Sequence, residues 1–179
     1  MALEVELKAH INDPASLLGQ LREHNHLCEH PIDRFDTYLY SEKADRTIRL
    51  RREGASLLVT TKERNTEARI EVNQEYEFST DATAEEELIQ FFSSLEYAVV
   101  LTKQKAGFGF TSSATDLLPA LLIEVCEVAP LGWFVELEYV VADERVLVHA
   151  KRGLLEALDR LKIARSAIES RPYATLLCQ

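Results

Sequence analysis

Pairs of like-charged residues separated by one residue recur along this chain, and they constrain its fold more than any other feature. The first stretch, LEVELKAHI at residues 3–11, alternates apolar and charged residues. That period of two is typical of a β-strand with one apolar face and one polar face. Each pair places two like charges on one face of one strand. The pairs are Glu4/Glu6, Arg49/Arg51, Glu75/Glu77, Lys103/Lys105 and Glu136/Glu138.

Similar patterns predict further strands and a few helices. Asp13 followed by Pro14 is typical of a helix start, and Thr83 followed by Glu86 has the spacing of a capping box. We expect an α+β protein whose antiparallel sheet forms a closed or nearly closed β-barrel with peripheral helices. The expected strands are 3–11, 34–41, 46–53, 55–64, 68–79, 98–110, 120–128 and 132–141, and the expected helices are 12–25, 81–97 and 144–162.

Length, charge and cysteine content narrow the class of protein. A chain of 179 residues predicts a single domain over residues 1–179. The net charge of −10 disfavours nucleic-acid binding. No apolar run is long enough to cross a bilayer, and no signal peptide is visible at the N-terminus, so we expect no membrane partner. Three widely spaced cysteines without a C-x-x-C pair favour reduced thiols and a cytoplasmic protein.

The charged strand faces allow two interpretations. A sheet packed on one side and solvated on the other gives the same alternation. However, the pairs are of both signs, with acids on the first and late strands and bases between them. If the sheet closes, these faces meet inside, where carboxylates can hold a divalent metal and Arg and Lys can bind phosphate oxygens. The second interpretation predicts a site for a triphosphate and a metal.

The order of these motifs carries a resemblance to a known family. EVELK at 4–8 resembles the E-x-E-x-K signature that opens CYTH proteins, the family of class IV adenylyl cyclases and thiamine triphosphatases. LGWFVELE at 131–138 is similar to the family's L-G-x-F-x-E-I-E. The other matching segments lie between or after these two, in the family's order. They are FDTYL (35–39), IRLRR (48–52), VTTKE (59–63), EYEF (75–78), LTKQK (101–105) and RPYATLL (171–177).

The resemblance implies a barrel or tunnel that encloses a small-molecule triphosphate, with Mg²⁺ or Mn²⁺ as cofactor. Lys8 and Glu138 are the expected catalytic residues, and a homodimer is left open. The implied phosphate-binding residues are Lys8, Arg49, Arg51, Lys62, Lys103 and Lys105. The metal-binding residues are expected to be Glu4, Glu6, Glu124, Glu136 and Glu138.

The sequence departs from the family at Cys126. An acid, usually Asp, stands five residues before the Leu of L-G-x-F in the family, and this chain has a thiol there. A thiol is a poor ligand for Mg²⁺. Glu124 lies two residues earlier, on the same face of a regular strand, and is the expected substitute, whereas Glu127 should face the other way. A second departure is milder, because Lys105 replaces an Arg and keeps its charge.

Three functions are therefore considered. The first is a class IV adenylyl cyclase-like enzyme that converts ATP to cyclic AMP and pyrophosphate. The second is a triphosphatase that hydrolyses thiamine triphosphate, a nucleoside triphosphate or inorganic triphosphate. The third is a non-catalytic nucleotide or polyphosphate binder, which the missing acid at Cys126 favours.

Overall fold

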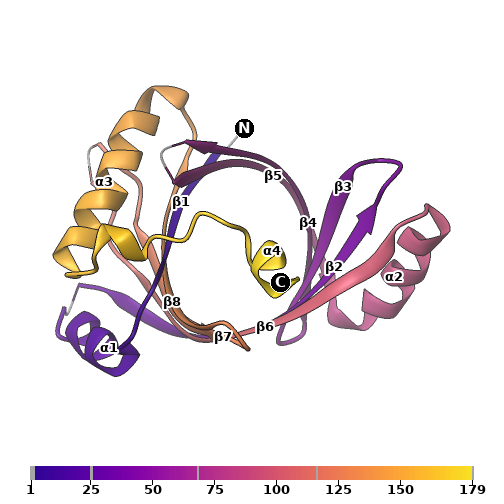
Figure 1. Cartoon of the computed structure of the whole chain (residues 1–179), viewed down its shortest axis with the longest axis horizontal. Helices are drawn as coiled ribbons and strands as arrows, with labels where there is room; N and C mark the ends of the chain where they lie inside the picture. Colours follow the sequence, from indigo (N-terminus) through magenta and orange to yellow (C-terminus); the bar gives the residue numbers. More distant parts are fainter. Residues whose placement is uncertain (1–2, 25, 68, 116, 179) are drawn as a thin grey trace.

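The computed structural model describes residues 3–24, 26–67, 69–115 and 117–178. In this part of the chain, eight antiparallel strands form a closed barrel in the order β1-β5-β4-β3-β2-β6-β7-β8 (Figure 1). The closed antiparallel barrel predicted from the sequence is confirmed. The strands are β1 (Leu3–His10), β2 (Cys28–Ser41), β3 (Arg46–Glu53), β4 (Ser56–Glu67), β5 (Ile70–Asp81), β6 (Ala98–Thr111), β7 (Leu122–Val128) and β8 (Gly132–Val141).

Helices lie outside the barrel wall, with one exception. The helix α1 (Pro14–Arg22) begins as expected, since the Asp13 side chain accepts a hydrogen bond from Ser16 N at 3.0 Å. The helix α2 (Glu85–Ser94) covers one side of the wall and α3 (Leu147–Arg160) covers the other (Figure 1). The short helix α4 (Tyr173–Leu177) lies inside the ring of strands (Figure 1). None of the described helices is long and apolar enough to cross a membrane.

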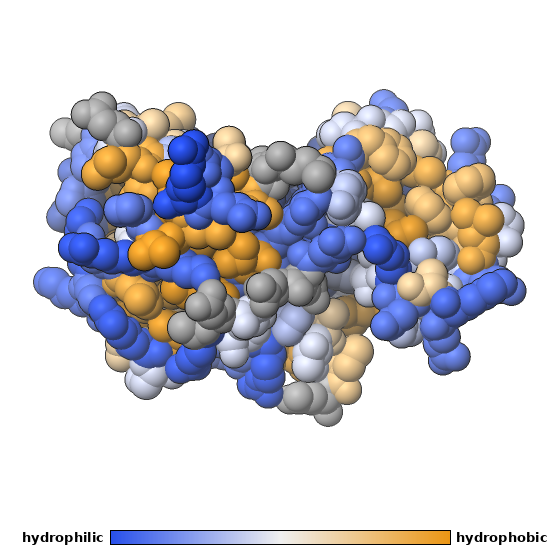
Figure 2. Space-filling model, turned by 90° about the horizontal axis from the view of Figure 1, so that it is seen from above, coloured by the Kyte–Doolittle hydropathy of each residue, from blue (hydrophilic) through white to orange (hydrophobic). Residues whose placement is uncertain are grey.

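The hydrophobic core lies outside the barrel wall rather than within it. Val5 and Leu7 of β1 are buried in an apolar cluster with Leu154 of α3, whereas Glu4 and Glu6 alternate with them and face inward. A smaller cluster, which includes Leu39 and Leu50, packs against α2. Figure 2 shows hydrophobic residues on two sides of the molecule, with a hydrophilic strip between them. The period-two pattern therefore separates a charged lining from an apolar outer wall.

The starts of β2 and α2 differ from the sequence prediction. β2 begins at Cys28 rather than at residue 34, because its first half pairs along β6 from Cys28↔Thr111 onward. Pro31 is tolerated there, since the pairing with β3 starts only at Phe35 and leaves one side of this segment open. The first turn before α2 is capped by Asp81, which accepts from Thr83 N at 2.9 Å, so the predicted capping box is wrong.

Candidate active site

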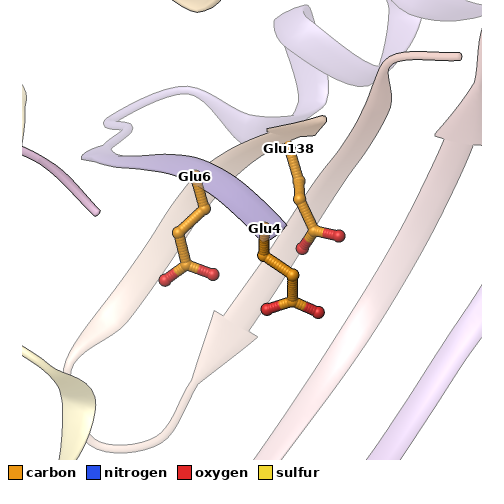
Figure 3. Close-up of side chains that lie close together, drawn as sticks. All are labelled: Glu4, Glu6 and Glu138. Carbon is orange, nitrogen blue, oxygen red and sulfur yellow. The ribbon is translucent and has the colours of Figure 1, made fainter. Parts of the chain in front are cut away.

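Three carboxylates from two neighbouring strands form an acidic cluster inside the barrel. Glu4 and Glu6 lie on β1, and Glu138 lies on β8 directly opposite Glu6. One oxygen of each carboxylate lies within 4.8 Å of the others, and all three project to the same side of their strands (Figure 3). Burial and the charge of Glu138 raise the pKa of Glu4 to about 9. Burial and the charge of Glu6 raise the pKa of Glu138 to about 7.

This acidic cluster fits a divalent cation. Close, partly buried carboxylates repel one another, and a bound cation removes both the repulsion and the need for protonation. Carboxylate oxygens are also the ligands that Mg²⁺ and similar hard cations prefer. The chemistry of the three donors therefore suits the cation that the sequence predicted. The acidic cluster consists of three of the five predicted metal ligands.

The other two predicted metal ligands, Glu124 and Glu136, lie apart from this cluster in a group of ion pairs. Lys105 Nζ contacts both carboxylates, at 2.7 Å from Glu136 Oε2, and Arg34 lies 2.7 Å from Glu124. Burial alone would raise the pKa of Glu136, but Lys105, Tyr173 and Lys103 together lower it. Basic side chains already neutralise these two acids. The five predicted metal ligands therefore divide into two groups: Glu4, Glu6 and Glu138, which have no such close ion pairs, and Glu124 and Glu136, which do.

Asp36 is a site residue that the sequence analysis missed. It is fully buried on β2, with Oδ1 at 2.8 Å from Arg51 Nε and Oδ2 at 2.8 Å from Lys103 Nζ. Burial opposes its charge, but Arg51 and Lys103 hold the pKa of Asp36 well below its usual range. An acid inside the motif FDTYL, opposite Arg51 in the strand register, was the available signal. Asp36 fixes two predicted phosphate-binding residues in place.

Arg49 and Lys62 form a third group with Glu75. Lys62 Nζ lies 2.6 Å from Glu75 Oε1, and Arg49 donates to Thr60 Oγ1 at 3.1 Å. Burial opposes ionisation of Glu75, but Lys62 and Arg49 lower its pKa to about 2. Arg49 Nε is buried and has no hydrogen-bond partner among the described residues. An anionic oxygen is the group that this N–H lacks.

Tyr173 of α4 packs against two of the predicted phosphate-binding residues. Its ring centroid lies 4.5 Å from Lys8 Nζ and 4.7 Å from Lys103 Nζ, and its hydroxyl donates to Glu136 Oε1. Lys8 Nζ also donates to the Arg171 carbonyl at 2.8 Å. The closing segment RPYATLL resembles the family, but the sequence predicted no site residue in it. The C-terminal segment thus makes contacts with two residues predicted to bind phosphate.

The space left inside the barrel is small. A cavity of about 50 Å³ remains, which is room for only a few water molecules. A larger hollow of about 320 Å³ adjoins it and shares Tyr38, Arg49 and Lys62 with the inner cavity. The predicted residues that line the inner cavity are Glu6, Lys8, Arg49, Arg51, Lys62, Lys103 and Glu136.

Cys126 faces this interior beside the paired acids. It is buried, and the charged groups that act on its thiol are Lys105, Glu124, Glu136 and Arg34. Burial raises the pKa of Cys126 to about 12, so the sulfur carries a proton at neutral pH. Glu127 is exposed, on the opposite face of β7. The position where the family has an acid thus carries a neutral thiol.

The comparisons with known proteins agree with this geometry. The model of the CYTH domain matches residues 2–173. This chain belongs to the CYTH family. The family resemblance inferred from the motifs is thereby confirmed. No curated protein matches the sequence.

Several solved structures share the CYTH fold of this chain. A conserved hypothetical protein from Pyrococcus furiosus has 23% identity and a TM-score of 0.76, covering 97% of this chain and 99% of its own. A proposed adenylate cyclase from Vibrio parahaemolyticus has 17% identity and a TM-score of 0.77, with 99% and 98% covered. A proposed adenylyl cyclase from Hippeastrum, described as having a dominant triphosphatase activity, has 17% identity and a TM-score of 0.63, with 96% and 91% covered. At these identities the likeness concerns the fold.

Proposed function

We propose that this CYTH protein is a divalent-metal-dependent enzyme that acts on a triphosphate held inside its barrel. The observation that carries the proposal is the convergence of basic side chains from several strands on one cavity beside the acidic cluster. The buried, unpartnered Nε–H of Arg49 adds specific support, because an anionic phosphate oxygen would satisfy it.

The residues divide into two working groups. Glu4, Glu6 and Glu138 would hold Mg²⁺ or Mn²⁺, which would supply neutralisation of the charge that develops on phosphate oxygens. Arg49, Arg51, Lys62, Lys103 and Lys8 would bind and align the phosphates. Phosphoryl chemistry needs little beyond such positioning and charge stabilisation. Lys105, which the sequence also predicted to bind phosphate, is already paired with Glu124 and Glu136. In this proposal it holds these two carboxylates in place.

The reaction that we favour is the cyclisation of ATP. The 3′-hydroxyl oxygen attacks the α-phosphorus. The bond between that phosphorus and the oxygen bridging the α- and β-phosphates breaks, and pyrophosphate leaves. The hydroxyl proton needs an acceptor, and Lys8 is the candidate because burial lowers its pKa, which favours the neutral amine that can accept a proton. The hollow of about 320 Å³ beside the inner cavity supports a substrate with a nucleoside attached to its phosphates.

Two alternatives share most of this site. Hydrolysis of the terminal phosphate would use the same basic side chains and the same cation, with water in place of the ribose hydroxyl as the attacking group. Non-catalytic binding of a nucleotide or polyphosphate is favoured by Cys126, since a neutral thiol stands where the family has an acid.

An activity panel tests the proposal. The protein is incubated with Mg²⁺ or Mn²⁺ and with ATP, thiamine triphosphate or inorganic triphosphate, and the products are identified. We expect cyclic AMP and pyrophosphate from ATP. Orthophosphate instead would identify a triphosphatase, and tight binding without any product would support the binder. Absence of both binding and turnover with every triphosphate would refute the proposal.

A further inference from the structure

Asn73 of β5 is a buried polar residue to which the proposed function gives no role. Its side chain is 0% exposed, and its Cα lies opposite that of Glu4 in the pairing of β1 with β5. The neighbouring pair, Val5 and Val72, packs in the apolar cluster outside the wall. Because side chains alternate along a strand, Asn73 faces the interior on the same side as Glu4.

The hydrogen bonds of Asn73 leave its carbonyl oxygen without a partner. Nδ2 donates to Glu71 Oε2 at 3.4 Å. The reverse orientation of the amide would bring two acceptor oxygens together, so this contact fixes which atom is Oδ1. Oδ1 is buried and accepts no hydrogen bond from any described residue. A buried carbonyl of this kind needs a donor or a cation.

The acidic cluster next to Asn73 also lacks a close positive charge. Lys62 Nζ lies 3.9 Å from Glu4 Oε2, at the limit of an ion pair, and three carboxylates share the space. A hydrated cation would supply positive charge to the carboxylates and O–H donors to the amide oxygen. Mg²⁺ keeps several waters when protein carboxylates bind it.

We propose that Asn73 is a positioning residue of the cation site. Its Oδ1 accepts a hydrogen bond from a water molecule bound to the divalent cation that Glu4, Glu6 and Glu138 hold. The inference rests on the proposed function, because it presumes that this cluster binds a cation. An amide oxygen suits the position, since it can accept a hydrogen bond from a bound water.

Direct Mn²⁺ binding to the full chain, without any triphosphate, tests the role of Asn73. Free Mn²⁺ is measured by electron paramagnetic resonance for the wild type, Asn73→Leu, Asn73→Asp and Glu138→Gln. Asn73→Leu keeps the approximate size but removes the acceptor, and we expect affinity to fall about 10–100-fold, the range usual for groups that support metal ligands. Asn73→Asp should bind Mn²⁺ more tightly than the wild type, because it adds a charged oxygen.

The controls separate this role from packing and from the cation site itself. Gln104→Leu replaces an exposed amide on the outer face of β6 and should leave Mn²⁺ affinity unchanged. Wild-type affinity in Asn73→Leu, together with weakened binding in Glu138→Gln, overturns the role of Asn73 alone. Unchanged affinity in both overturns the cation site and the role of Asn73 with it. If Asn73→Leu does not fold, Asn73→Asp decides the matter, and weaker binding than the wild type overturns the role.

Discussion

Ion pairs inside the barrel hold individual basic residues in position before any ligand binds. Asp36 illustrates this, because it joins Arg51 of β3 to Lys103 of β6 across β2. Removing one partner of a buried ion pair leaves the other charge uncompensated. The residue that organises two phosphate-binding candidates is therefore also important for stability.

We expect Asp36→Asn to lower the free energy of unfolding at pH 7 by roughly 3–5 kcal/mol. The carboxyl pKa is lower in the folded chain than its ordinary value of 3.8. The stabilisation that the Asp36 carboxylate contributes is therefore complete above pH 3.8. It is lost as the pH falls below that value, because the carboxyl of the unfolded chain becomes protonated before that of the folded chain. Urea unfolding at pH 7 and at about pH 3 measures both effects. An equal difference between variant and wild type at both pH values would contradict the assignment.

Cys126 offers a second test at the residue scale. Cys126→Asp would place an oxygen ligand where the family has an acid, and we expect the Mg²⁺ concentration for half-maximal turnover to fall about 10-fold or more. Glu124 is paired with Lys105 and Arg34, outside the acidic cluster. Loss of metal-dependent turnover in Glu124→Gln would show that it substitutes for that acid, and the exposed Glu127→Gln is the matched control. Steady-state rates as a function of Mg²⁺ measure all three. An inactive Cys126→Asp variant would favour the binder.

The sequence pointed to candidate site residues that repeat at i, i+2 or that lie in a motif of the family, and it missed Asp36, Asn73 and Tyr173. Strand alternation places Glu4 and Glu6 on one face of their strand and Glu136 and Glu138 on one face of theirs, and the family resemblance implied that these faces point inward and hold a metal. Asp36, Asn73 and Tyr173 could not be assigned in this way, since their importance depends on neighbours brought together by strand pairing. Which acids would pair with bases, as Glu136 does with Lys105, also depends on the closed register.

At the scale of elements, strands with a strong alternation were predictable and those with a weak one were not. The segment 28–33 of β2 has no clear alternation and contains Pro31, yet its pairing with β6 makes it a strand. The helix α4 has five residues, too few to be stable alone. It is held by contacts of Tyr173 and Arg171 with the barrel lining.

The position of α4 predicts that it competes with the triphosphate. Tyr173 lies between Lys8 and Lys103, and the cavity beside it is too small for three phosphates. Tyr173→Ala should therefore increase the association rate of inorganic triphosphate several-fold, because each of the contacts that hold α4 is worth about 1 kcal/mol. Stopped-flow binding measures this rate, with Tyr97→Ala beside α2 as the control. A slower association would mean that Tyr173 forms part of the binding site.

Over the whole molecule, the apolar packing and the proposed binding groups are located in different places. The apolar clusters lie between the wall and the helices, and the charged groups lie inside the wall. A change in the outer layer should consequently alter stability without altering ligand affinity.

Leu154 of α3 tests this separation, because it is completely buried in the larger cluster. We expect Leu154→Ala to reduce the free energy of unfolding by about 2–5 kcal/mol. The affinity for inorganic triphosphate should stay within twofold of the wild type, roughly the scatter of such measurements. Urea unfolding and calorimetric titration measure the two quantities. A parallel loss of affinity would show that the two layers are coupled.

The alternation of inner and outer faces also limits how chains of this family can change in length. Inserting one residue in the middle of β8 would turn Leu137 inward and Glu136 and Glu138 outward, because a one-residue shift inverts every following side chain. A single insertion would thus remove the acidic cluster and expose the apolar layer together. Gains and losses of residues should fit this barrel best in the connections between strands, or as a local bulge such as the register shift between β2 and β6 at Tyr38 and Leu39. Homologous chains of different length should accordingly differ in their loops while their strands remain in phase.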